Sequence, residues 1–213
     1  MTSINAQISM LKSLLKSFIY FFLSPFIVRR ARASNVCITF DDGPHPENTV
    51  RILDILYKYN INAIFFMTGT EMVKYPEVVR SVIVGGHKVG YHGFSHTSMR
   101  KQAFGEFRDE MTQKKMLENK FNIRLNIYRP PFGDLSFTGF FILVMNRCKI
   151  IMWSLDSRDS YDTEQQILET LSVKHIHPGE IILFHDDYAK TTNLLDKLLT
   201  EYARAKILCG VNL

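Results

Sequence analysis

The sequence predicts an α/β fold in which parallel strands alternate with helices. Seven short apolar runs, rich in β-branched and aromatic residues, are separated by segments with apolar side chains at helical spacing. Such alternation is typical of parallel sheets covered by helices. The chain has 213 residues, of which 46% are hydrophobic, and this is enough to bury one sizeable core in a single domain.

The predicted strands are short and end at polar or turn-forming residues. They are residues 36–40, 63–67, 88–91, 126–129, 149–155, 180–184 and 206–211.

The predicted helices lie between these strands. Asn48 or Thr49 caps the first helix, Pro76 opens the second and Gly85-Gly86 ends it. Later helices are predicted at 104–120, 137–148, 163–174 and 192–205. Each strand is therefore joined to the next through a helix, which is the usual connection between parallel neighbours.

Residues 1–34 differ from the rest and are predicted to form a separate helical segment before a domain of residues 35–213. Apolar side chains recur at helical spacing from Ile8 to Phe22, and Lys12 and Lys16 fall on the opposite side. The following apolar run ends at residue 28 and is shorter than the roughly 20 residues that a membrane span requires.

Three interpretations of this segment compete: a membrane-surface anchor through residues 8–28, an extra helix packed on the domain, and a signal peptide cleaved after Ala31-Arg32-Ala33. We favour the anchor, because Arg29 and Arg30 precede the cleavage motif and the next predicted strand begins almost directly after it. This interpretation predicts association with a membrane, at the bacterial cell envelope or its cytoplasmic face, rather than secretion.

The formal net charge of +5 is confined to the same segment. The first 34 residues hold five basic and no acidic residues, and the remaining chain holds 21 of each. A neutral domain argues against nucleic acid as a partner, whereas a basic tail suits an anionic membrane surface. The three cysteines form no CxxC pair, which argues against a disulfide scaffold or a cysteine zinc site.

Two adjacent carboxylates, Asp41 and Asp42, end the first predicted strand and precede Gly43-Pro44. The carboxyl ends of strands carry the chemistry in open α/β sheets and α/β barrels. Adjacent strand residues point to opposite faces, so the two acids are able to serve different roles.

Polar side chains stand at the ends of further predicted strands. They are His92 and His96, Arg129, the run from Asp156 to Asp159, and His185. Histidines at i and i+4 face the same way on a helical turn, and this spacing is common in metal chelation. Since parallel strands share an edge, these side chains are predicted to converge on one rim.

Taken in order, Asp41-Asp42, residues 92–96 (HGFSH), residues 129–133 (RPPFG), Asp156 to Asp159, and Leu183-Phe184-His185 resemble the five motifs of the polysaccharide deacetylase family. This family, also called the NodB homology group or carbohydrate esterase family four, includes chitin and peptidoglycan deacetylases. The resemblance covers roughly residues 35–213. It implies a distorted (β/α)7 barrel in a single domain, in agreement with the seven predicted strands.

The resemblance implies a metal centre formed by Asp42, His92 and His96. One carboxylate and two imidazoles with an open position suit Zn²⁺, and Co²⁺ or Ni²⁺ are alternatives.

The resemblance also implies catalytic and substrate-binding roles. Asp41 is the general base, Arg129 its orienting partner, His185 the general acid and Asp159 the carboxylate that keeps His185 charged. The implied substrate-binding residues are Pro131, Phe132 and Leu183, with the N–H of Phe132 facing the oxyanion and Leu183 lining the acetyl pocket.

Two positions depart from the family pattern. Ser160 stands where tryptophan is usual after the acid of the fourth motif, and Tyr91 stands where asparagine commonly precedes the first metal histidine. Neither is a metal ligand or a proton-transfer residue, so activity is still expected.

The expected function is metal-dependent hydrolysis of the N-acetyl group of an N-acetylhexosamine in a glycan, oligosaccharide or lipid-linked sugar, with release of acetate. Alternatives within the family's chemistry are O-deacetylation, amino-sugar deformylation and cyclic-amide hydrolysis. An alternative from another class is a catalytically inactive carbohydrate-binding relative, which the complete set of implied catalytic residues argues against.

Overall fold

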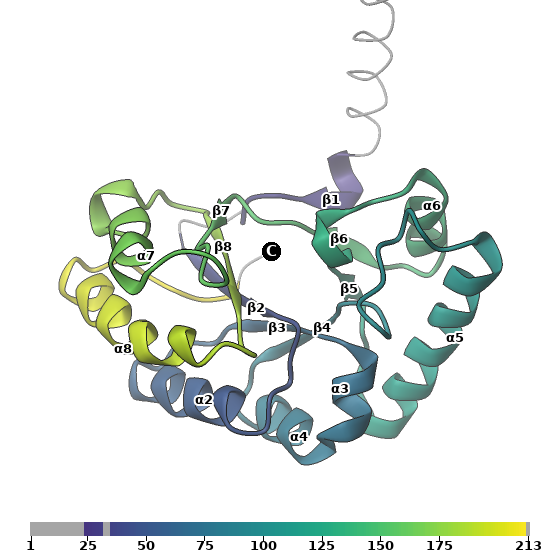
Figure 1. The fold of residues 1–213 in the computed structure, drawn as a ribbon, viewed down its shortest axis with the longest axis horizontal. Coiled ribbons are helices and arrows are strands. Elements are labelled where there is room, and N and C mark those ends of the chain that lie inside the picture. Colours follow the sequence, from purple (N-terminus) through teal and green to yellow (C-terminus); the bar gives the residue numbers. More distant parts are fainter. Residues whose placement is uncertain (1–23, 32–34, 212–213) are drawn as a thin grey trace, which may run out of the picture.

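The computed structural model describes residues 24–31 and 35–211 (Figure 1). Within these ranges, eight parallel strands form one curled sheet in the order β1-β6-β5-β4-β3-β2-β8-β7, with helices on its outer side. The sheet is a curled half-barrel in a single domain. The predicted α/β class with a distorted (β/α) barrel is therefore confirmed.

The strands are β1 (Ile27–Val28), β2 (Cys37–Asp41), β3 (Ile64–Met67), β4 (Lys88–Tyr91), β5 (Ile127–Tyr128), β6 (Lys149–Ile151), β7 (Leu155–Asp156) and β8 (Ile181–His185). The α-helices are α2 (Asn48–Lys58), α3 (Gly69–Lys74), α4 (Pro76–Val84), α5 (Phe104–Phe121), α6 (Phe137–Met145), α7 (Glu164–Thr170) and α8 (Ala189–Arg204). Three short 3-10 helices are η1 (Ser24–Phe26), η2 (Pro131–Gly133) and η3 (Val173–His175).

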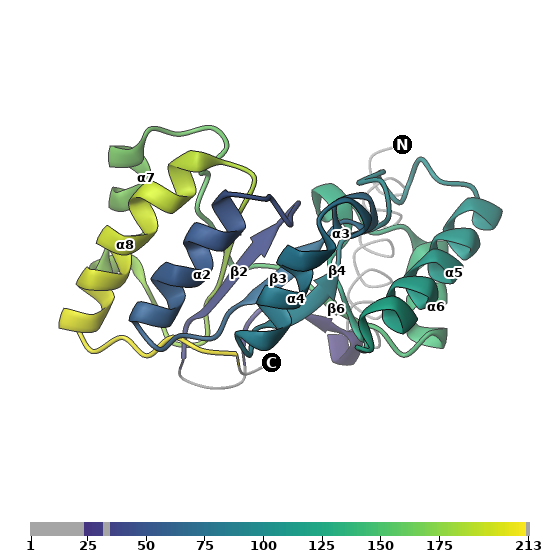
Figure 2. The ribbon, with the colours of Figure 1, turned by 90° about the horizontal axis from the view of Figure 1, so that it is seen from below.

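The core lies between the sheet and its covering helices. Every residue of β2 is buried, and α2 turns Ile52 and Leu56 toward the sheet while its other face is exposed. Figure 2 shows α8, α2 and α4 in a row along the outside of the sheet. Burying one apolar stripe per helix in this way is the main stabilising contribution of such a fold.

The neighbouring strands β2 and β8 pair in parallel along their whole length. Their pairing places Asp41 beside His185, and the hydroxyl of Thr39 donates to the carbonyl of Ile182 at 2.7 Å. Both strands therefore deliver their last residues to the same edge of the sheet.

Two strand predictions need correction. The run 149–155 is not one strand, because β6 pairs with β5 and β1 whereas β7 pairs with β8 on the other side of the curled sheet. Residues 206–211 form only a single bridge, Val36 to Cys209, and no regular strand. Neighbours in the tertiary structure, and not local β-propensity, decide both outcomes.

The described part of the N-terminal segment belongs to the sheet. Ser24–Phe26 form a 3-10 turn, and β1 then pairs with β6. Beyond β1, the amide of Ala31 donates to the carbonyl of Gly179 at 2.8 Å, and Arg30 pairs with Glu180 at 3.1 Å. Residues 8–23, the greater part of the predicted membrane anchor, lie outside the described residues. Among the helices in the described ranges, none combines the length and apolar character needed to cross a membrane.

Candidate active site

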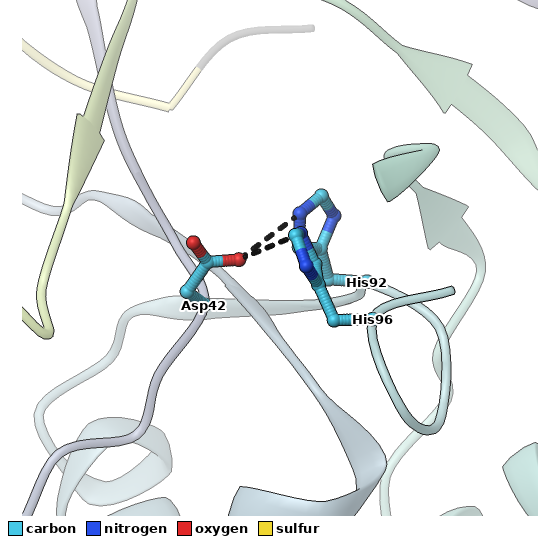
Figure 3. Close-up of side chains that lie close together, drawn as sticks. All are labelled: Asp42, His92 and His96. Carbon is cyan, nitrogen blue, oxygen red and sulfur yellow. Dashed lines mark ion pairs between the residues drawn. The ribbon is translucent and has the colours of Figure 1, made fainter. Parts of the chain in front are cut away.

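Asp42, His92 and His96 meet at the carboxyl edge of the sheet (Figure 3). Asp42 Oδ1 lies 3.4 Å from Nε2 of His92 and 3.0 Å from Nε2 of His96. The potential ligand atoms all lie within 4.8 Å of one another. Asp42 Oδ1 is buried and has no hydrogen-bond partner within the described residues. One orphaned carboxylate oxygen facing two imidazole nitrogens is the donor set expected for a single divalent cation such as Zn²⁺.

The electrostatics of this cluster also favour a cation. Burial alone would raise the pKa of Asp42, but the adjoining imidazoles of His92 and His96 outweigh it and hold that pKa far below the usual range. Burial disfavours the charged form of His92, yet Asp41 and Asp42 raise its pKa above the ordinary value. The negative charge of the two carboxylates therefore favours a positive charge at this position, as a metal cation would supply.

The loop that carries the two histidines is not the helical turn that their spacing predicts. Residues 92–96 form an irregular loop in which Gly93 and His96 have positive φ angles of 79° and 52°. The Nδ1 atom of His92 lies 2.7 Å from the carbonyl oxygen of Arg129, and a hydrogen bond there leaves Nε2 free to face Asp42. The ring of His96 packs on Phe132 with centroids 4.5 Å apart. The helical turn predicted from the i,i+4 spacing is therefore wrong, although the two imidazoles do lie together beside Asp42.

Asp41 is held by a fully buried arginine. Nη1 of Arg129 donates to Asp41 Oδ1 at 2.6 Å and to the hydroxyl of Thr39 at 2.8 Å. Nε and Nη2 of the same guanidinium donate to the carbonyls of Ile151 and Met152, where the chain leaves β6. The other oxygen of Asp41, Oδ2, lies 3.6 Å from Nε2 of His92 and so points toward the cation site. A buried carboxylate that is paired with an arginine and has its second oxygen facing the cation site is suited to act as a general base.

His185 is held by Asp159. The Nδ1 atom of His185 lies 2.7 Å from Asp159 Oδ1, and its backbone N–H donates to Asp159 Oδ2 at 2.8 Å. The hydroxyl of Thr191 also donates to Oδ2 at 2.6 Å. Burial of the imidazole opposes the charged form, but the hydrogen bond and charge of Asp159 outweigh it and raise the pKa of His185 to about 9. His185 is therefore protonated at neutral pH, as a general acid needs to be.

This arrangement predicts the alkaline limb of the pH profile. If protonated His185 is required, activity falls as pH rises through its pKa. In Asp159→Asn the main partner of the imidazolium is lost while burial remains, so the pKa falls and the alkaline limb moves to lower pH by at least about one unit. The measurement is kcat/KM from pH 5 to 10. Asp162→Asn is the matched control, because Asp162 pairs with Arg158 and not with His185. An unchanged limb in Asp159→Asn would contradict the assignment.

The site opens into two hollows on either side of the cation site. One, of about 480 Å³, holds Asp41 and His185 together with Phe132, Leu183 and Trp153. The other, of about 320 Å³, is lined by polar side chains that include Thr70, Glu71 and Asp187. Both hollows share Asp42 and His96, so the candidate cation site adjoins each of them.

The predicted substrate residues fall in different places. Phe132 and Leu183 line the larger hollow. Pro131 is not among the described residues that line it; it is buried, and its Cγ lies 3.3 Å from the position that a Cβ on Gly93 would take. Pro131 therefore supports the histidine loop. The hollow that contains Ser160 still has aromatic walls, because Trp153, Tyr161 and Tyr188 also line it.

Sequence reasoning missed one supporting acid, Glu110 on α5. Its side chain is buried and accepts hydrogen bonds from the hydroxyl of Tyr128 at 3.0 Å and from Nε2 of Gln102 at 2.8 Å. Burial raises the pKa of Glu110. The sequence signal for Glu110 was its position next to Met111 on the inward face of a helix, because a buried carboxyl group needs a hydrogen-bond partner.

The sequence is similar to known carbohydrate deacetylases. The family model described as polysaccharide deacetylase matches residues 29–150, which is more than half of the chain. The chain belongs to the polysaccharide deacetylase family. A peptidoglycan-N-acetylglucosamine deacetylase of Bacillus cereus is 30% identical over 171 residues, covering 78% of this chain and 80% of that protein. Another relative is the peptidoglycan-N-acetylmuramic acid deacetylase PdaC of Bacillus subtilis, of which this chain covers only 35%. A third is named as a chitooligosaccharide deacetylase.

Solved structures share the fold. The Bc1960 peptidoglycan N-acetylglucosamine deacetylase superposes with a TM-score of 0.80 at 26% identity, covering 88% of this chain and 90% of that one. A pseudoenzyme of the same family from Bacillus anthracis superposes with a TM-score of 0.79 at 26% identity, covering 86% and 66%. Members of this family therefore include inactive proteins, and catalysis requires the full set of side chains at the site.

Proposed function

We propose that this protein is a metal-dependent de-N-acetylase that hydrolyses the N-acetyl group of an N-acetylhexosamine in a glycan, oligosaccharide or lipid-linked sugar. One observation carries the proposal: the orphaned oxygen of Asp42 faces two imidazoles in a groove that also holds a carboxylate fixed by Arg129 and an imidazolium fixed by Asp159. A binding module has no need for this combination of base, acid and cation site.

Asp42, His92 and His96 would hold the cation, which we propose to be Zn²⁺, with Co²⁺ or Ni²⁺ able to replace it. When bound, it would polarise the amide carbonyl as a Lewis acid and make water acidic enough to ionise near neutral pH. The residues fit this group, because their free atoms converge and the cluster carries an unpaired buried oxygen.

Two side chains of the protein carry out the proton transfers, Asp41 as the base and His185 as the acid. Asp41, oriented by its hydrogen bond from Arg129, takes the proton from the attacking water. Phe132 lines the larger hollow, and in this proposal its backbone N–H donates to the developing oxyanion. Protonated His185 gives its proton to the sugar nitrogen as the bond from the carbonyl carbon to that nitrogen breaks. The products are acetate and a free amine.

The deciding experiment measures acetate release from chitooligosaccharides, peptidoglycan fragments, a polyprenyl-linked N-acetylglucosamine and acetylated xylan. We expect release from at least one N-acetylated substrate, loss of at least about 10²-fold of that rate with a chelator, and recovery with Zn²⁺ or Co²⁺. Release from xylan alone would assign an O-deacetylase. No release from any substrate by protein shown to contain metal would contradict N-deacetylation.

We also propose that the enzyme works at a membrane, at the cell envelope or its cytoplasmic face. The basic amphipathic pattern of residues 8–22 supports this. A chain that begins at residue 24 keeps β1 and its pairing with β6. We expect this shortened chain to move from the membrane to the soluble fraction, and we expect it to keep its rate on a soluble substrate. Unchanged fractionation would show that residues 1–23 are not needed for membrane association.

A further inference from the structure

The outer face of α6 is apolar and exposed. Phe137, Phe141 and Met145 follow one another at helical i,i+4 spacing, and their side chains are 66%, 47% and 82% exposed. Nothing in α6 is charged, and Thr138 is its one exposed polar residue. A helix of a globular protein usually places charged or polar side chains on its outer face. Such a face marks an interaction surface.

This apolar face continues onto the start of the described chain. Phe26 of η1 is 40% exposed and packs edge-on against Phe140 with centroids 6.1 Å apart. Phe140 in turn contacts Phe141, which contacts Phe137. Figure 1 shows α6 at the outer edge of the molecule, near the purple start of the described chain. The face therefore lies where the basic amphipathic segment joins the domain.

A basic hollow borders the C-terminal end of the same helix. Between the end of α5 and the residues after α6 lies a space of about 840 Å³ lined by Lys114, Lys115, Arg124 and Arg147, with Glu118 as its acidic residue. Lys114 pairs with Glu118 at 2.9 Å. The three other cations have no acidic partner within the described residues. The domain as a whole is electrically neutral, so this concentration of positive charge is local.

We propose that the α6 face, defined as Phe26, Phe137, Phe141 and Met145, docks on an anionic phospholipid bilayer, with Lys115, Arg124 and Arg147 contacting lipid headgroups. Apolar side chains bordered by cations match the interface between acyl chains and anionic headgroups. A second, independent contact beside the N-terminal segment holds the domain against the membrane instead of leaving it on a tether. This inference rests on the membrane location proposed above.

The test uses the full chain and vesicles of phosphatidylcholine with or without phosphatidylglycerol, in a sedimentation assay. We expect wild type to bind the anionic vesicles. Phe141→Ser/Met145→Ser is expected to weaken binding by about tenfold or more, and Arg124→Gln/Arg147→Gln to weaken it and reduce its salt dependence. Tyr57→Ser/Val84→Ser removes large side chains from α2 and α4 that are more exposed than Phe141 and Met145, and this variant should bind as wild type. Arg51→Gln/Lys197→Gln is the matched charge control and should also bind as wild type.

Other results would overturn the inference. If the α6 variants bind vesicles as wild type does, or if wild type does not bind anionic vesicles, the face does not dock on lipid. A wild type that is dimeric without vesicles, with a monomeric α6 variant, would assign the face to a second copy of the chain. If residues 8–23 resist hydrogen exchange without vesicles and lose that protection in the α6 variant, the face holds the chain's own N-terminal segment. All four variants should keep their rate on soluble substrate, which separates failure of docking from failure of the deacetylase function.

Discussion

Asp41→Asn is expected to lower kcat by about 10² to 10⁴-fold while the protein still binds its metal. Asp41 contributes a base and not a ligand in the proposed reaction, because its Oδ1 is engaged by Arg129 and its Oδ2 lies 3.6 Å from His92. His92→Ala should lose both metal and activity, since His92 offers its Nε2 to the cation site. The measurements are steady-state kinetics and metal content after dialysis.

His177→Ala is the matched histidine control, because His177 is exposed and remote from the cation site. It should keep both metal and activity. Near-normal kcat in Asp41→Asn would show that another group takes the proton from water. A full metal content in His92→Ala would show that His92 is not a ligand.

Arg129→Met is expected to lower the free energy of unfolding by about 3–5 kcal/mol and to abolish activity. The guanidinium is fully buried and pairs with Asp41, and its Cζ lies 4.1 Å from the centroid of the Phe66 ring. Its removal leaves a buried carboxylate without a countercharge and two backbone carbonyls without a donor. Urea unfolding at pH 7 measures the loss.

A double variant tests whether the buried charge is the cause. Arg129→Met/Asp41→Asn removes both charges and should be more stable than Arg129→Met alone, because the unpaired carboxylate is gone. Arg80→Gln is the surface control: Arg80 and its partner Glu77 are both more than half exposed, so the change should cost less than about 1 kcal/mol. A double variant no more stable than the single would assign the loss to packing and backbone hydrogen bonds.

Most of the site was predictable from the sequence because its residues follow strands. A polar residue directly after an apolar β-type run must lie at the strand's carboxyl end, and parallel strands bring those ends together. Asp42 and His185 are brought to one edge in this way, through the parallel pairing of β2 with β8. This reasoning needs only local patterns and one topological rule.

The supporting contacts were less predictable. Glu110 lies on a helix far from the motifs in the sequence, and its partners Tyr128 and Gln102 are set by packing. The break after β6 occurs where Arg129 takes the carbonyls of Ile151 and Met152, so a distant side chain ends a strand that the local sequence would continue. The loop of His92 and His96 likewise depends on contacts of Arg129 and Phe132, and not on helical spacing.

The sequence alone thus determined the α/β class, the edge that carries the chemistry and the chemical type of each residue there, because hydrophobic periodicity and turn residues act over a few positions. Only the tertiary structure decided which donor faces which acceptor, where β6 ends and that Ile27–Val28 join the sheet. Very short strands and buried ion pairs are stabilised by neighbours distant in the chain, and no local pattern records which neighbours those are.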